Sequence, residues 1–258
     1  MSALVDSHCH LDAAEFAADR DAVLARARAA GVVAQIVPAV RLADFAPLRA
    51  LCAAHADLHP AYGLHPMFLT PQTHAQLPAL ADWLAREHAV ALGECGLDFH
   101  VSEPAAQLQR DCFHAQLRLA REFDLPLILH ARRAVDEVIA TLRRHAPLRG
   151  VVHSYSGSAE QARQLWRLGF LIGVGGPLTY ERARRLRSLV AGMPLEYLLL
   201  ETDAPDQPLA THRGERNEPA RLREVAQTVA QLRGIEPAEV AAATCANAQR
   251  LFTRARLH

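Results

Sequence analysis

Residues 89–130 read AVALGECGLDFHVSEPAAQLQRDCFHAQLRLAREFDLPLILH, and three segments with different hydrophobic patterns follow one another in them. Residues 89–96 and 127–130 are short apolar runs of the kind that form buried strands. Between them, residues 105–123 carry apolar side chains at helical spacing, at positions 108, 112, 115, 119 and 123. A buried strand, an amphipathic helix and a second buried strand together predict a parallel βαβ unit.

The same alternation extends over the whole chain. Two final helices are expected at residues 218–233 and 237–252, and eight candidate strands cover residues 4–8, 32–38, 61–65, 89–96, 127–130, 151–154, 170–174 and 197–203. Eight strands in 258 residues favour an α/β fold of one (β/α)8 TIM barrel over an open doubly wound sheet. The phosphate-binding fingerprints of open sheets, G-x-G-x-x-G and G-x-x-x-x-G-K-[ST], are absent from the sequence. Without an internal repeat or a linker, residues 1–258 are expected to form one domain.

The composition disfavours several classes of protein. Half of the residues are hydrophobic and 22% are charged, which is enough for a large core and excludes a disordered chain. A formal net charge of zero disfavours a protein that holds nucleic acid mainly by charge, although one local basic cleft is still compatible with it. The sequence shows no apolar run near 18 residues, no basic n-region at its start, and five scattered cysteines. We therefore expect a cytoplasmic protein with reduced thiols, no membrane span and no obligate protein partner.

Residues that can bind metal ions follow the predicted strands at their carboxyl ends. In a TIM barrel these ends meet at one rim, where the active site lies. Side chains two apart on a strand share a face, so Asp6, His8 and His10 can all face the barrel interior. The imidazoles and carboxylates proposed as ligands are His8, His10, Glu94, His130, His153 and Asp203.

Taken singly, each of these residues also has an ordinary structural explanation. A strand-end histidine is often a hydrogen-bonded core residue, and Glu94 or Asp203 could form a buried ion pair. Their convergence on one rim instead predicts a metal site. Six ligands are too many for one tetrahedral ion with an open position, so two divalent ions such as Mg, Mn or Zn are expected. The chain contains no lysine, which excludes a carbamylated lysine between the ions and leaves Glu94 as the candidate.

Motifs along the whole chain resemble the TatD family of metal-dependent deoxyribonucleases. The six motifs at the strand ends are His8-Cys9-His10, Gly63-Leu64-His65-Pro66, Gly93-Glu94-Cys95-Gly96-Leu97-Asp98, His130-Ala131-Arg132, His153-Ser154-Tyr155-Ser156-Gly157 and Glu201-Thr202-Asp203-Ala204-Pro205. The C-terminal matches are Arg216-Asn217-Glu218-Pro219 and the spaced set Thr244, Asn247, Arg250-Leu251-Phe252. Within the family, Ala204-Pro205-Asp206-Gln207-Pro208 is most similar to the YjjV-type branch.

The resemblance implies a TIM barrel of the metallo-dependent hydrolase type that acts on DNA ends, as a 3′–5′ exonuclease on single strands or 3′ ends. It implies that His8, His10 and Asp203 hold one ion. It further implies that His130 and His153 hold the other, with Glu94 bridging the two.

Two departures from the family pattern lie beside this site. Tyr155 stands where phenylalanine is commoner, and Asp206-Gln207 replaces a tyrosine-leucine pair. They bear on the choice of substrate more than on the metal ligands.

Roles in catalysis follow as hypotheses. Asp203 could take the proton of a water activated by the two ions, with Glu94 holding the ions together. His65 and Arg132 are the candidates for binding phosphate, although a capping histidine and a surface arginine are the alternatives. Glu201 shares strand parity with Asp203 and could orient a ligand or form a buried ion pair. The arginine-rich run at residues 182–187 could follow a DNA backbone, although such runs are more often solvated helix faces.

Two other functions remain compatible with these residues. A two-metal barrel could hydrolyse a small amide, ester or lactone with the same activated water, and would then need neither Arg132 nor the arginine-rich run. A binding module without catalysis is disfavoured, because a competent residue fills every metal-ligand position that the resemblance implies.

Overall fold

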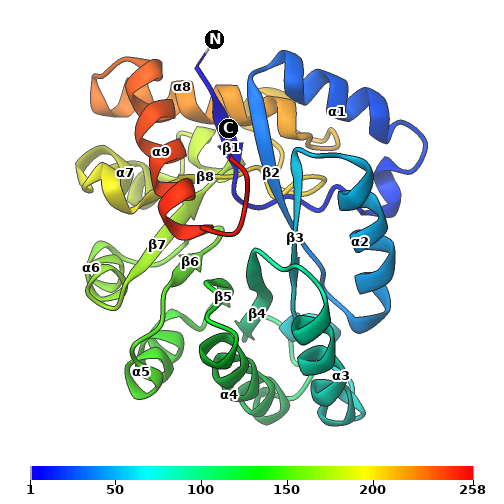
Figure 1. The fold of residues 1–258 in the computed structure, drawn as a ribbon. Coiled ribbons are helices and arrows are strands. Elements are labelled where there is room, and N and C mark those ends of the chain that lie inside the picture. Colours follow the sequence, from blue (N-terminus) through cyan, green and yellow to red (C-terminus); the bar gives the residue numbers. More distant parts are fainter. Residues whose placement is uncertain (1, 258) are drawn as a thin grey trace.

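The computed structural model describes residues 2–257, in which eight parallel strands form a ring and helices surround it (Figure 1). The strands are β1 (Leu4–Asp6), β2 (Val32–Pro38), β3 (Leu58–Tyr62), β4 (Ala91–Asp98), β5 (Leu127–Arg132), β6 (Gly150–Val152), β7 (Phe170–Val174) and β8 (Leu198–Leu200). The α-helices of the described residues are α1 (Arg20–Ala29), α2 (Phe45–Ala54), α3 (Thr73–Arg86), α4 (Ala106–Glu122), α5 (Val135–His145), α6 (Ala159–Arg167), α7 (Arg184–Gly192), α8 (Leu222–Arg233) and α9 (Pro237–Leu251).

Each strand pairs in parallel with the next strand in sequence, from β1 to β8. Two backbone hydrogen bonds just beyond the strands then connect the last strand to the first. Ser7 N donates to Leu200 O at 3.0 Å, and Asp203 N donates to His8 O at 2.9 Å. The predicted (β/α)8 barrel is confirmed.

The inside of the barrel holds a core of its own. One cluster of buried side chains takes one or two residues from every strand, among them Val5, Ile36 and Leu199. Leu251 and Phe252 at the end of α9 belong to the same cluster. Because the cluster also includes Val90, which precedes β4, α9 covers the end of the barrel where the strands begin. The opposite end stays available for the strand-end loops.

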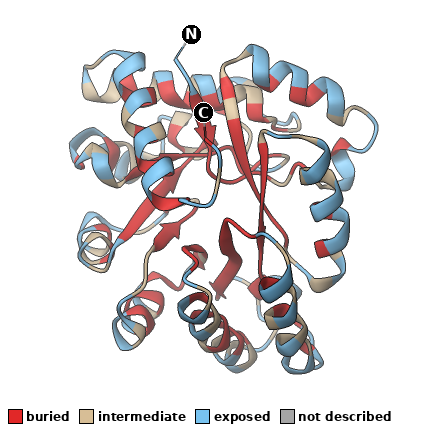
Figure 2. Cartoon of the chain, in the orientation of Figure 1, coloured by how far each residue is buried: buried red, intermediate tan, exposed pale blue. Residues whose placement is uncertain are grey.

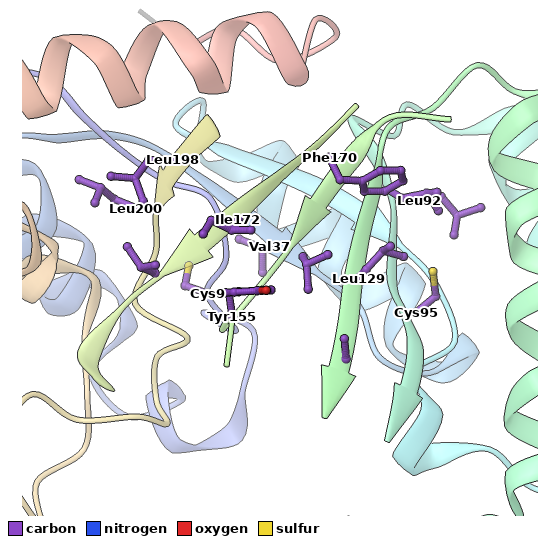
Figure 3. Close-up of a cluster of buried hydrophobic side chains, with 14 of the residues drawn as sticks. Cys9, Val37, Leu92, Cys95, Leu129, Tyr155, Phe170, Ile172, Leu198 and Leu200 are labelled. Atoms are coloured by element: carbon purple, nitrogen blue, oxygen red, sulfur yellow. The ribbon is translucent and has the colours of Figure 1, made fainter. Parts of the chain in front are cut away.

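A second, larger core fills the layer between the strands and the helices. Figure 2 shows the strands buried and the outer faces of the helices exposed. Figure 3 shows part of this layer, where Leu92 of β4, Leu129 of β5, Ile172 of β7 and Leu200 of β8 take part. Alternate residues of each strand therefore enter different cores, which is why the strands are almost uniformly apolar.

Several strands differ in length or position from those expected. The first and last strands end at Asp6 and Leu200, earlier than predicted, because polar side chains just beyond these ends bond across the β1–β8 boundary. The third strand begins at Leu58 rather than at residue 61, although it contains Pro60. Proline has no backbone N–H to donate, but the carbonyl of Pro60 still accepts from Val90 N at 3.0 Å. The predicted helix 218–233 begins at Leu222, after the short 3-10 helix η7 (Pro219–Arg221).

The buried face of α4 also differs from the apolar stripe in the sequence. The predicted positions Leu108 and Leu119 are only half-buried, whereas Gln109 and Gln116 are buried. Their amides hold strand-end backbone: Gln109 bonds to the N–H and the carbonyl of Asp98 at 2.8 and 3.0 Å, and Gln116 does the same for Leu64. Two glutamines of α4 thus fix the loops after β3 and β4.

Among residues 2–257, no helix is long and apolar enough to cross a membrane.

Candidate metal centre

The six residues predicted as ligands converge at the carboxyl end of the barrel, around Glu94. This carboxylate is 1% exposed, and its two oxygens face different histidines. Glu94 Oε2 lies 3.2 Å from His8 Nε2 and 3.5 Å from His10 Nε2. Glu94 Oε1 lies 2.9 Å from His130 Nδ1 and 2.7 Å from His153 Nε2. The carboxylate therefore stands between two sets of imidazole nitrogens.

Asp203 completes the set around Oε2. Its Oδ1 lies 3.5 Å from His8 Nε2 and 3.7 Å from His10 Nε2, and the two imidazole nitrogens are 3.2 Å apart. Donors about 2.1 Å from a tetrahedral ion stand about 3.4 Å from one another. The spacing and chemistry of His8, His10 and Asp203 therefore fit a divalent ion, and one ion could contact all three.

The set around Oε1 is equally close. His130 Nδ1 and His153 Nε2 are 3.3 Å apart, and the ring of His153 stacks on that of His8 with centroids 3.9 Å apart. His8, Glu94 and His153 form one triplet that could hold an ion, and His65, Glu94 and His130 form another. Imidazole and carboxylate donors of this kind suit Zn and Mn, and carboxylates also suit Mg.

The electrostatics of the centre follow from its burial. Burial raises the pKa of Glu94, but the neighbouring histidines outweigh this effect and hold the pKa well below its usual range. Burial lowers the pKa values of His10 and His153, yet contact with Glu94 raises them to about 9 and about 10. Burial also raises the pKa of Asp203. Without a metal the centre therefore holds protons that an ion must displace.

His65 was expected near the rim, but it lies against Glu94 in the metal centre. It is 5% exposed, and its Nε2 lies 3.0 Å from Glu94 Oε1. Its Nδ1 accepts the N–H of Met67 at 3.1 Å, at the start of the 3-10 helix η3 (Pro66–Phe68). With Nδ1 occupied as an acceptor, Nε2 carries the proton, so His65 is a donor toward the centre. The capping role considered in the sequence is confirmed, because the ring caps η3, and phosphate binding by His65 stays a prediction.

Arg132 is the last residue of β5, two residues after His130, and its side chain is exposed. In the part of the chain that the structure describes, its guanidinium forms no hydrogen bond or ion pair. Its donors are thus available to an anion at the rim.

Asp98 is a residue of the centre for which the sequence predicted no role. Its Oδ2 accepts from His130 Nε2 at 2.8 Å, and its Oδ1 accepts from His100 N at 2.8 Å. The bond to Nε2 leaves Nδ1 of His130 directed at Glu94, in the arrangement by which carboxylates orient metal-binding histidines. Asp98 shares strand parity with Glu94, which was the available signal in the sequence.

Asp6 and Asn217 fix the segments that carry His8 and Asp203. Asp6 does not face the centre, contrary to expectation, since its Oδ2 accepts from Thr202 Oγ1 at 2.6 Å and its Oδ1 accepts from Thr202 N and His8 N. Asn217 donates to Thr202 O at 2.9 Å. The strand-parity argument for Asp6 fails because β1 ends there and the chain turns before His8.

Glu201 lies behind His153. It is 1% exposed, its Oε1 is 3.9 Å from His153 Nδ1, and it accepts the backbone N–H of Ser154. Burial raises its pKa to about 8. A Cβ on Gly173 of β7 would overlap the carboxyl group, so only glycine there leaves room for it. Among residues 2–257, the ion-pair partner of Glu201 is His153, so a buried ion pair and a role in positioning His153 and Ser154 both fit its place in the structure.

Gln207 is the departure from the family pattern that touches the centre. Its amide bonds to Asp203 Oδ2 and to Ser154 Oγ, and so connects the loops after β8 and β6. Tyr155, the other departure, is buried and its hydroxyl donates to Ser158 O at 2.7 Å, away from the ligands.

The chain is similar to known proteins in both sequence and fold. A family model described as TatD related DNase matches residues 5–253. The uncharacterized metal-dependent hydrolase YjjV of Escherichia coli (strain K12) is 43% identical over 96% of this chain and 97% of its own length. The crystal structure of YjjV superposes with a TM-score of 0.93 at 41% identity, over 97% of this chain and 98% of that one. A protein of Erwinia tasmaniensis named 3'-5' ssDNA/RNA exonuclease TatD is 36% identical over 96% of this chain and 99% of its own length.

The role of Asp98 can be tested by Asp98→Asn. The amide keeps the size of the side chain but no longer holds His130 as an anionic acceptor, so metal affinity should fall about 10–100-fold. Competition with a chelating dye measures the affinity, and circular dichroism checks the fold. Asp111→Asn, an exposed aspartate on α4, should bind metal as the wild type does. Unchanged affinity in Asp98→Asn would contradict the role.

Metal binding should depend on pH in a defined direction. Protonated imidazoles cannot bind an ion, so affinity should rise with pH until the pKa values of His10 and His153, about 9 and about 10, are passed. At pH 7, loading should release about two protons per chain. Calorimetry in buffers of different ionisation enthalpy counts them. His10→Gln should release about one proton fewer, and His74→Gln on α3 should release as many as the wild type. Equal affinities at pH 6 and pH 8 would refute this expectation.

Proposed function

Since the chain belongs to the TatD-related DNase family of metal-dependent hydrolases, we propose that it hydrolyses phosphodiester bonds of DNA and releases nucleotides from the 3′ ends of single strands. The name of the Erwinia relative, an ssDNA/RNA exonuclease, supports this substrate class. The proposal includes two divalent ions per chain, of Mg, Mn or Zn. A cytoplasmic location remains a prediction.

The observation that carries the proposal is the position of Glu94. Its two oxygens face two sets of imidazoles, so one carboxylate can contact two ions. In the proposed assignment, His8, His10 and Asp203 would hold one ion, and His130 and His153 would hold the other. When bound, such ions lower the pKa of water and neutralise charge on a phosphate.

The chain's own residues supply the remaining parts of the reaction. Asp203 keeps Oδ2 bonded to Gln207, while Oδ1 faces the centre. Burial raises the pKa of Asp203, which makes its carboxylate a stronger acceptor for the proton of the attacking water. His65 presents an N–H at Glu94, and Arg132 presents its guanidinium at the rim. Both can donate to phosphate oxygens, and the arginine fork can donate two parallel bonds.

The proposal is tested by metal analysis combined with a nuclease assay. Wild type, Glu94→Gln and the matched control Glu239→Gln, an exposed glutamate of α9, are incubated with single-stranded DNA labelled at either end, with and without chelator. We expect two ions per wild-type chain and stepwise shortening from the 3′ end. Chelator should abolish the shortening. Glu94→Gln should slow it more than about a hundredfold, which exceeds the loss expected when a residue that only orients a metal ligand is replaced.

Other outcomes would contradict parts of this proposal. Bound metal with intact DNA would exclude the nuclease and favour hydrolysis of a small amide, ester or lactone, which panels of such substrates would reveal. Equal activity of Glu94→Gln and Glu239→Gln would remove Glu94 from the reaction.

Arg132→Ala tests the phosphate-binding role separately. Removing a charge-assisted hydrogen bond to phosphate should lower kcat/KM for DNA at least about tenfold without changing metal content. Single-turnover and steady-state assays measure the rates, and Arg86→Ala on α3 serves as the control. An unaltered rate would show that Arg132 is a surface residue.

A further inference from the structure

A basic pocket lies beside the metal centre and has no part in the function proposed so far. Its volume is about 320 Å³, at the lower end of the range of about 300–1,000 Å³ for sites of small ligands. It opens between the loops that follow β6, β7 and β8, and its lining includes Ser154, Ser156, Arg182, Arg184, Arg185 and Gln207. A larger hollow beside α1, lined by Arg20 and His55 among others, contains none of the six predicted ligands.

The charge of this pocket is unbalanced. Arg184 and Arg185 are exposed, and within residues 2–257 their guanidinium groups form no hydrogen bond or ion pair. Arg182 stacks on the ring of Tyr180, 5.1 Å from its centroid. Surface arginines elsewhere in the molecule are commonly paired with acids, as Arg28 is with Asp57 at 2.7 Å. Three arginines without acidic partners around one hollow make a site for an anion.

The pocket shares a wall with the metal centre. Gln207 lines the pocket and bonds to Asp203, a predicted ligand. Ser154 lines the pocket from the other side, directly after His153, and bonds to the amide of Gln207. The hydroxyl of Tyr180 donates to Pro208 O at 3.0 Å, which holds the segment that precedes α7 against the loop of Gln207. The pocket therefore adjoins the metal centre through the side chains of Gln207 and Ser154.

We propose that this pocket binds a second phosphate of the substrate, on the nucleotide next to the one that is cleaved. The inference rests on the proposed nuclease function and narrows its substrate class, because it makes the enzyme select strands over single phosphate esters. Arg184 and Arg185 provide the phosphate donors, and Ser154 and Ser156 provide hydroxyls that can bond to sugar or phosphate oxygens. The pocket positions the strand without reading its sequence, since phosphate contacts are the same for every base.

Binding without catalysis gives the first test. Fluorescein-labelled ten-residue oligothymidylate is titrated with metal-free protein in EDTA, and anisotropy is followed at several salt concentrations. The double variant Arg184→Gln/Arg185→Gln should bind at least about tenfold more weakly than wild type. Its dependence of log affinity on log salt should be shallower by about 0.7 for each phosphate that the variant no longer neutralises. Arg86→Gln/Arg118→Gln, which removes two exposed charges from α3 and α4, should bind as wild type does.

Kinetics of the metal-loaded enzyme give the second test. The double variant should raise KM for the oligonucleotide about tenfold and leave kcat/KM for the p-nitrophenyl ester of thymidine 5′-phosphate, which has one phosphate, unchanged. Equal oligonucleotide binding by wild type and the double variant would overturn the proposal that the pocket binds a phosphate. A difference in binding with no hydrolysis by wild type would instead overturn the proposed nuclease function and keep the pocket as a nucleic-acid site.

Discussion

A charged carboxylate buried at the mouth of the barrel is the constraint on which the rest of the structure depends. Glu94 is 1% exposed, and taking an unpaired carboxylate out of water would cost several kcal/mol. Imidazoles from the ends of β1, β3, β5 and β6 surround it and offset that cost. The offset is available only if these four strand ends meet at one point. Closing the ring of strands and assembling the centre are therefore one physical requirement.

Much of the space for this arrangement comes from side chains that are small or absent. A Cβ on Gly63 would lie 2.7 Å from the carbonyl carbon of Gly93 and 2.8 Å from Glu94 O, which no side chain tolerates. Gly173 makes the corresponding room for Glu201 behind His153. Longer side chains then hold the loops from outside, as Gln116 does for Leu64. The rim is thus tightly packed although it is built from loops.

The sequence predicted the barrel and the meeting of the six ligand-type residues because both follow from periodicity and the position of polar residues after apolar runs. It did not predict which groups Asp98, Asp6 and Gln207 bond to. These depend on how the chain turns after a strand ends, which a period of two residues cannot describe. The burial of Gln109 was not predicted for a related reason. Hydrophobic periodicity counts every glutamine as polar, and so does not separate a buried glutamine that bonds to backbone from an exposed one. The boundaries of β1 and β8 were too long because bonding by Asp6 replaces strand pairing there.

The bond between Asp6 and Thr202 joins residues 196 positions apart, and it anchors both His8 and Asp203. On a ribosome that adds about 5–20 residues per second, these two partners emerge about 10–40 s apart. During that interval the nascent chain already carries Glu94 and its first histidines but lacks the acid that completes their set. The set of His8, His10 and Asp203 is thus completed later in synthesis than the other groups of the centre, because Asp203 follows every histidine of the centre in the chain.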